Sequence, residues 1–277
     1  MAGPTTPASE REAIDHVLVT NDDGIASPGL DAVVDALSPF ADVTVVAPVE
    51  NLSGIGTQRS DSVSYERTDR GYAVDGTPAD CVAFGARGLD RPVDAVVSGC
   101  NLGPNAGRYV LGRSGTVGAA IEAAWMGLPA VAVSAYDPES LFTRPADAFS
   151  YERAADAVEY LLPTAVDACT SETGPDLLNV NVPVERRAEM RLTEPADHYD
   201  TEIDRADGTV RFDDDYGPVN SLAGGAEGTT RADIDVPAYS EQGAIRDGVV
   251  GVSPLAVPLE PVDCRRTRSA VETYEPT

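Results

Sequence analysis

Two adjacent acidic residues follow the first strongly apolar segment of the sequence. The segment HVLVT (16–20) leads into Asn21, and Asp22, Asp23 and Gly24 come directly after it. Adjacent carboxylates repel each other unless a cation lies between them, and the chain contains no lysine that could serve. A divalent cation with oxygen ligands, Mg²⁺ or Mn²⁺, is therefore expected at this position. The alternative is that Asp22 caps the following helix and Asp23 belongs to a turn.

Two polar loops after later apolar segments can supply further oxygen ligands. The loop APVENLSG (47–54) contains Ser53, whose hydroxyl can reach the same cation, although Ser-Gly is also ordinary turn chemistry. The loop SGCNLGPNAG (98–107) places two asparagines among three glycines, which let the backbone approach a ligand closely. Asn101 can supply a neutral oxygen ligand or hold an oxygen of an anion, and we count Asn105 and Asn21 as candidate substrate contacts. A purely structural turn is the alternative for this loop.

A fourth segment, RSGTV (113–117), opens a strongly helical stretch. The backbone N–H groups of Ser114, Gly115 and Thr116, two hydroxyls and the helix dipole together form a typical anion site. Ser114 and Thr116 suit plain N-capping equally well. Beside a metal site, the expected anion is a phosphate, and Arg113 is a further candidate contact for it.

Short apolar segments alternate with helical patterns over the first two thirds of the chain. Strands are expected at 16–20, 43–48, 94–98, 130–134 and 176–182, a hairpin at 62–66 and 71–74, and helices at 28–37, 78–86, 116–127 and 151–162. This alternation predicts an α/β fold with a mostly parallel, doubly wound sheet. Ligands of such sheets bind at the carboxyl ends of the strands, which is where all four polar segments fall.

The chain divides into three predicted regions. Residues 1–14 are expected to be a disordered lead-in, and 15–185 a Rossmann-like catalytic core. Residues 186–277 are polar, acidic and rich in glycine at first, with strand-like pieces at 209–212 and 249–255. We expect this C-terminal extension to form hairpins or an arm that closes onto the core and makes oligomer contacts.

Charge excludes several classes of partner. The 277 residues include 46 acidic and 20 basic side chains, all of the latter arginine, for a formal net charge of −26. Such a surface repels nucleic acid and anionic membranes, and together with the absence of lysine it indicates adaptation to very high salt. No apolar segment is long enough to span a membrane, and the N-terminus lacks the pattern of a signal peptide. A soluble, cytoplasmic protein is expected.

Cysteine and histidine chemistry is poorly supported. Cys81, Cys100, Cys169 and Cys264 are widely spaced and form no C-x-x-C pair. Histidine occurs only twice, so the sequence gives little support to a mechanism that needs a histidine base. Catalysis would have to use carboxylates, amides, hydroxyls and a metal.

The ordered motifs closely resemble the SurE family of survival proteins, which are 5′/3′-nucleotidases. The resemblance covers about residues 16–185 and resumes weakly near 248–255; its blocks are NDDGIASPG, APVENLSG, GTPADCV, SGCNLGPN, SGTVGAAIE and LLNVNVP. It implies a three-layer α/β/α sandwich, one divalent cation per subunit, and dimers or tetramers joined through C-terminal elements. It also implies hydrolysis of nucleoside monophosphates, and in some members of polyphosphate.

The family's functional residues map onto this chain at each motif. The resemblance implies metal ligation by Asp22, Asp23, Ser53 and Asn101, and phosphate contacts from Ser114, Gly115 and Thr116. The loop before SGTV departs from the family pattern: Tyr109 replaces a usual Asp, Arg113 replaces a usual Tyr, and the loop has one more residue. These departures affect the substrate pocket and the preferred base, while the mapped ligands are unchanged.

The expected activity is therefore that of a phosphomonoesterase in which a metal-activated water attacks the phosphoryl group of a nucleoside monophosphate. Asp22, Asp23 and Asn101 are the expected catalytic residues, and the sequence leaves open which aspartate accepts the proton. One alternative is a haloacid-dehalogenase-type phosphatase, but this type needs D-x-D-x-T and a lysine. A receiver-like signalling module also needs a lysine and is about half as long. A catalytically silent nucleotide-binding protein is the third alternative.

Overall fold

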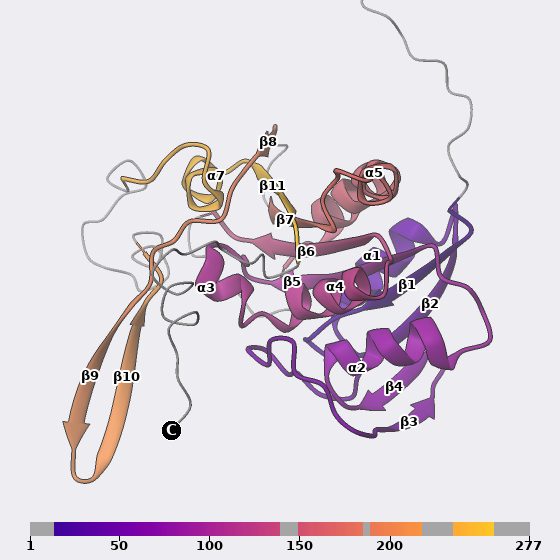
Figure 1. Cartoon of the computed structure of the whole chain (residues 1–277), viewed down its shortest axis with the longest axis horizontal. Coiled ribbons are helices and arrows are strands. Elements are labelled where there is room, and N and C mark those ends of the chain that lie inside the picture. Colours follow the sequence, from indigo (N-terminus) through magenta and orange to yellow (C-terminus); the bar gives the residue numbers. More distant parts are fainter. Residues whose placement is uncertain (1–13, 139–148, 185–188, 218–234, 258–277) are drawn as a thin grey trace, which may run out of the picture.

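The computed structural model describes residues 14–138, 149–184, 189–217 and 235–257 (Figure 1). The lead-in expected at 1–14 lies outside these residues except for Ile14. Cys264 and the rest of 258–277 also lie outside them.

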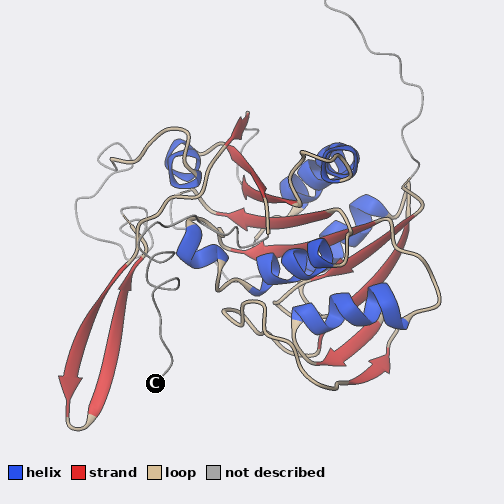
Figure 2. Cartoon of the chain, viewed as in Figure 1, coloured by secondary structure: helices blue, strands red, loops and turns tan. Residues whose placement is uncertain are grey.

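Strands form the centre of the molecule, with helices around them (Figure 2). Nine of them make one sheet in the order β3-β4-β2-β1-β5-β6-β7-β11-β8. Its strands are β1 (His16–Thr20), β2 (Asp42–Pro48), β3 (Ser64–Arg67), β4 (Tyr72–Asp75), β5 (Ala95–Leu102), β6 (Ala130–Tyr136), β7 (Leu177–Pro183), β8 (Met190–Leu192) and β11 (Val250–Leu255). Neighbouring strands are parallel except β3 with β4 and β11 with β7. Strands β1, β6 and β7 are buried at every position, as strands of a parallel sheet covered on both faces must be.

Two helical layers cover the sheet. Helices α1 (Pro28–Leu37) and α5 (Glu152–Cys169) pack together on one face, and α2 (Pro78–Ala83) and α4 (Gly115–Trp125) pack together on the other. Alternate residues of β1 enter the two cores, since Val17 and Val19 belong to one apolar cluster and Leu18 to the other. The prediction of a three-layer α/β sandwich with a mostly parallel sheet is confirmed.

The direction of strand addition reverses at β1. Strand β2 pairs with one edge of β1 and β5 with the other, so the crevice between the carboxyl ends of β1 and β5 is the topological switch point. Ligands of doubly wound sheets bind at such a crevice. The polar segments that follow β1 and end β5 therefore meet where a site is expected.

Helix α2 begins with a capping box that also holds a neighbouring loop. Thr77 accepts from the backbone N–H of Asp80, and the Asp80 carboxylate accepts from that of Thr77. The same carboxylate accepts from Arg59 Nε and the N–H of Ser60, both at 2.9 Å, and Thr77 Oγ1 donates to the carbonyl of Gln58. The GTPADCV motif thus fixes the end of the loop that contains Ser53.

The C-terminal extension contributes to the main sheet. Strands β8 and β11 form its edge, and helix α7 (Glu241–Asp247) packs against β11. Strands β9 (Asp200–Ala206) and β10 (Thr209–Asp215) form a separate antiparallel ribbon that projects from the body (Figure 1).

Several boundaries differ from the expectations. Strand β5 continues through Asn101, where the sequence predicts a loop, and helix α5 continues past Pro163 to Cys169. The short helix α3 (Arg108–Leu111), the π-helical turn η1 (Phe84–Gly88) and β9 had no apolar periodicity by which to recognise them. No helix in the described part of the chain is both long and apolar enough to cross a membrane.

Candidate metal and phosphate site

Asn21 folds the turn that follows β1. Its side-chain amide donates to the carbonyl of Gly24 at 3.0 Å, and its Oδ1 accepts from the N–H of Gly24 at 3.2 Å. Gly24 has a φ of +97°, which favours glycine. Both the oxygen and the nitrogen of the Asn21 side-chain amide therefore bond to Gly24 within the turn. A contact between Asn21 and the substrate stays a prediction.

Asp22 points from this turn to the N-terminus of α4. Its side chain is only 2% exposed, and Thr116 Oγ1 donates to its Oδ1 at 2.6 Å. A Cβ on Gly115 would lie 2.9 Å from Asp22 Oδ2, so only glycine permits this approach. Helix α1 is capped by Ser27, which accepts from the N–H of Gly29. The alternative in which Asp22 caps that helix is therefore wrong.

Asp23 is held between the loop that follows β2 and the last residue of β5. Its Oδ1 accepts from Asn51 Nδ2 at 2.9 Å, and its Oδ2 from the N–H of Leu102 at 3.3 Å. Asn51 Oδ1 in turn accepts from the N–H and the hydroxyl of Ser53, at 3.0 and 2.8 Å. Asn51 thus connects Ser53 to Asp23. Sequence reasoning missed this residue, although it lies within the APVENLSG motif.

Asn101 contributes a buried amide near the end of β5. Its Nδ2 donates to the carbonyl of Gly103 at 2.7 Å, which leaves its Oδ1 without a hydrogen-bond donor among the described residues. The strand pairing shifts register between Ser98 and Asn101, and this irregularity brings the end of β5 to Asp23 through Leu102.

The surroundings of both aspartates disfavour their ionised forms. Burial raises the pKa of Asp22, and hydrogen bonds, that of Thr116 first, lower it only in part. Burial and then the charge of Asp22 raise the pKa of Asp23 to about 6. A cation between the two carboxylates would favour their charged forms.

The donor set fits a hard divalent cation. Two carboxylates, the Oδ1 of Asn101 and the hydroxyl of Ser53 are all oxygen donors, which Mg²⁺ and Mn²⁺ prefer. Among the described residues no three His, Cys, Asp or Glu side chains group to hold a metal. A metal at this site would therefore depend on Asn101 and Ser53 as well as on the aspartates.

The predicted phosphate segment lies beside Asp22. Ser114 is the N-cap of α4 and accepts from the N–H of Val117 at 3.1 Å, while the Thr116 hydroxyl donates to Asp22. Both hydroxyls thus have partners within the chain. The carbonyl of Arg113 accepts from the N–H of Gly56 at 2.9 Å, which ties the start of α4 to the Ser53 loop.

Asn105 is placed differently from the other predicted residues, in a buried polar network. Its N–H donates to Asn181 Oδ1, its carbonyl accepts from the amides of Asn179 and Asn181, and its own amide donates to Ser134. Its contacts anchor the loop after β5 onto β6 and β7.

Glu241 of α7 completes this network. It is 1% exposed and accepts from the N–H of Gly107 at 2.7 Å and from Asn179 Nδ2 at 2.8 Å. Neither Glu241 nor the asparagines of LLNVNVP were identified from the sequence, because their partners lie more than 60 residues away.

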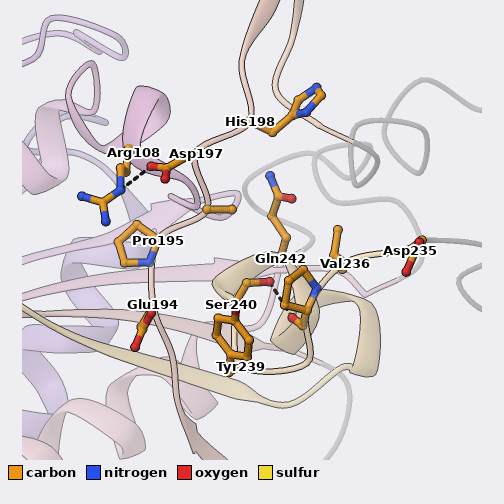
Figure 3. A pocket seen from close by; sticks show the side chains of 12 residues that line it. Arg108, Glu194, Pro195, Asp197, His198, Asp235, Val236, Tyr239, Ser240 and Gln242 are labelled. Carbon is orange, nitrogen blue, oxygen red and sulfur yellow. Dashed lines mark hydrogen bonds and ion pairs between the residues drawn. The ribbon is translucent and has the colours of Figure 1, made fainter.

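A cavity of about 380 Å³ lies next to the anchored loop (Figure 3). Arg108 of α3, the segment 194–198 and the start of α7 line it, and Arg108 pairs with Asp197 at its edge. None of the residues predicted for the site lines this cavity. The candidate residues at the switch point therefore lie outside this cavity.

Comparison with known proteins agrees with the arrangement of motifs. The family model described as Survival protein SurE matches residues 17–202. The chain belongs to the SurE family. A relative from Halobacterium salinarum, named 5′-nucleotidase SurE, is 44% identical over 246 residues, covering 88% of this chain and 92% of the relative. A relative of the same name from Haloarcula marismortui is 42% identical over 266 residues, covering 94% of this chain and 95% of the relative. Another, from Deinococcus radiodurans, is 38% identical over 269 residues, covering 92% of each chain.

The fold of this SurE-family chain also matches a solved structure. The crystal structure of the SurE protein from Aquifex aeolicus superposes with a TM-score of 0.71 at 28% sequence identity. The match covers 93% of this chain and 99% of the other. Since about 7% of this chain lies outside the match, most of residues 186–277 lie within it.

Proposed function

We propose that this protein is a metal-dependent 5′/3′-nucleotidase that hydrolyses nucleoside monophosphates. The observation that carries the proposal is made at the switch point of the sheet, where Asp22 contacts the N-terminus of α4 and the adjacent Asp23 contacts the end of β5 next to Asn101. The names of the relatives, 5′-nucleotidase SurE, support the same activity.

The metal ligands in this proposal are Asp22, Asp23, Ser53 and Asn101. A bound Mg²⁺ or Mn²⁺ would neutralise phosphoryl charge and lower the pKa of a water molecule. Asn51 orients Asp23 and Ser53, and Thr116 orients Asp22. Such outer contacts hold ligands in the geometry that the metal needs.

The protein's own groups perform the remaining steps. The N-terminal turn of α4 stabilises the phosphoryl oxygens through its dipole, and Asn101 stabilises the charge that develops on them. One of the two aspartates accepts the proton of the attacking water. Arg113, at the start of this turn, increases attraction for an anionic substrate in a strongly acidic protein.

A phosphate-release assay tests the proposal. Purified protein is incubated with AMP, GMP and 3′-nucleotides, with Mg²⁺, Mn²⁺ or EDTA, at low and high KCl. We expect release only with the metal, and none from Asp22→Asn or Asp23→Asn at unchanged folding. Absence of release under every condition would favour a silent nucleotide-binding protein, and a trapped phospho-aspartate would favour the haloacid-dehalogenase type.

We further propose a homodimer or homotetramer assembled through the β9–β10 ribbon. Ile203 and Phe212 are directly opposite each other on this ribbon and are 51% and 66% exposed. Two-stranded ribbons are marginally stable alone, and exposed apolar pairs favour a protein partner. Light scattering after size exclusion should give a dimer or tetramer mass, and Ile203→Asp with Phe212→Asp should reduce it. A wild-type monomer would contradict the assembly.

A further inference from the structure

The base of the ribbon lies against the turn that leads into α4. Tyr199 immediately precedes β9, and its ring stacks on Tyr109 of α3 with centroids 3.4 Å apart and planes within 9°. Tyr216 immediately follows β10, and its centroid is 5.6 Å from that of Tyr109 and 6.1 Å from that of Tyr199. Because the Tyr216 ring is about equally far from both other rings, it lies beside the stacked pair. Only Tyr109 and Tyr199 stack face to face.

Arg113 occupies the other face of Tyr109. Its Cζ lies 4.4 Å from the centroid of the Tyr109 ring. Tyr199 at 3.4 Å leaves no room on its own face, so the guanidinium must stack on the opposite one. The order is therefore Arg113, Tyr109, Tyr199, with a cation on an aromatic face that a second ring supports from behind.

Asp214 joins the two strands of the ribbon to this stack. Its carboxylate accepts from the hydroxyls of Tyr199 at 3.2 Å and Tyr216 at 3.1 Å. A hydrogen bond from Thr201 is the largest cause that lowers the pKa of Asp214, and the charge of Arg113 contributes to the same lowering. The ribbon thus meets Arg113 through ring stacking and through charge.

Arg113 lies between the Ser53 loop and the N-terminus of α4, two parts of the candidate site. The carbonyl of Arg113 accepts a hydrogen bond from the N–H of Gly56 in the Ser53 loop. The next residue, Ser114, is the N-cap of α4, the helix that contacts Asp22. Two aspartates lie at this site in a protein of net charge −26, so an anionic substrate approaches against repulsion. Arg113 directly precedes the α4 cap, so its guanidinium, stacked on Tyr109, would offset that repulsion where phosphate is expected.

We propose that Tyr199, acting through Tyr109, is a positioning residue that holds the Arg113 guanidinium beside the N-terminus of α4 for the substrate phosphate. The proposal rests on the nucleotidase function proposed above. It gives the projecting ribbon a role in substrate affinity, and it assigns a use to the two positions, Tyr109 and Arg113, at which the loop departs from the family pattern.

A double-mutant cycle tests the proposal. Arg113→Ala should raise KM for AMP about tenfold, the effect of losing about 1.4 kcal/mol of binding, with kcat within about twofold. Tyr199→Ala should raise KM about three- to fivefold in the wild-type background and leave it unchanged in the Arg113→Ala background, because its effect passes through Arg113. Tyr199→Phe keeps the ring and should stay near wild type. Assays use the lowest KCl at which the protein remains folded, since salt screens the charge.

Two controls distinguish positioning of Arg113 from a general effect of losing a surface tyrosine and from recognition of the nucleotide base. Tyr160→Ala, at an exposed tyrosine of α5, should leave KM unchanged. The rise in KM should be the same for p-nitrophenyl phosphate as for AMP, because the contact is with phosphate. Additive effects in the cycle, or a rise seen with AMP alone, would overturn the proposal. If the protein hydrolyses no nucleotide, the same cycle is measured by calorimetry with inorganic phosphate, so the two proposals fail separately.

Discussion

Thr116 donates a hydrogen bond of 2.6 Å from its Oγ1 to Oδ1 of Asp22, although the two residues are 94 positions apart. The bond joins the second turn residue after β1 to the first turn of α4. Gly115 permits the contact, since any Cβ there would meet the Asp22 side chain at 2.8 Å. A hydroxyl expected to contact phosphate therefore orients a candidate metal ligand in this structure.

Replacing Thr116 by valine tests the importance of that bond. Valine has nearly the same shape and lacks the hydroxyl, so Asp22 would lose its side-chain donor. We expect activity to fall about 10- to 100-fold, the usual loss when a group that orients a metal ligand is removed. Thr116→Ser keeps the hydroxyl and should lose far less. Steady-state phosphate release over a Mn²⁺ titration measures both variants, and wild-type activity in Thr116→Val would show that the bond is dispensable.

Asn51 gives a second prediction, at the link between Asp23 and Ser53. Asn51→Ala removes the donor to Asp23 and the acceptor for Ser53. We expect the Mn²⁺ concentration for half-maximal activity to rise about 10- to 100-fold while the fold remains intact. Glu50→Gln, at the neighbouring exposed position, is the matched control and should change little. An unchanged metal requirement in Asn51→Ala would exclude Asn51 from the site.

The residues that follow strands could be located from the sequence, and their partners could not. Asp22 and Asp23 come just after β1, and the alternation of strands and helices is local enough to predict that the polar segments lie at the carboxyl ends of strands. Asn51 and Thr116 acquire their roles through contacts across 28 and 94 positions. The extension of β5 through Asn101 was missed because glycine and asparagine have low strand propensity, which the pairing with β6 overrides.

Glu241 provides a prediction about pH and stability. Burial raises its pKa, and hydrogen bonds, from Gly107 first and then from Asn179 and Ser253, with the charge of Arg108, lower it only in part. With the folded pKa above the unfolded one, the contribution of this carboxyl to stability is fully present below the unfolded pKa and is lost as pH rises through the folded pKa. Glutamine does not titrate. The free energy of unfolding of the wild type, relative to Glu241→Gln, should therefore fall as pH rises from about 4.

Urea unfolding at a series of pH values measures this difference. Glu194→Gln, at an exposed carboxylate whose backbone contacts the start of α7, is the control and should show no comparable trend. A difference between wild type and Glu241→Gln that rises with pH would mean that the hydrogen bonds hold the carboxylate charged in the folded state.

We expect the stability of the β9–β10 ribbon to depend on salt, because acidic residues are opposite each other on its two strands. Glu202 and Asp213 are directly opposite each other on β9 and β10, and Asp200 is opposite Asp215. Like charges in directly opposed positions destabilise an antiparallel pair, and salt screens exposed charges to within about 3 Å at 1 M. Glu202→Gln should therefore slow hydrogen exchange of the ribbon amides at low KCl, by about 0.2–1 kcal/mol in opening free energy, and lose this advantage in molar KCl.

Glu66→Gln, on β3 opposite Ala73, is the matched control, because it removes an exposed charge without relieving a cross-strand repulsion. Equal protection of the ribbon in wild type and Glu202→Gln at every KCl concentration would show that cross-strand repulsion does not limit its stability.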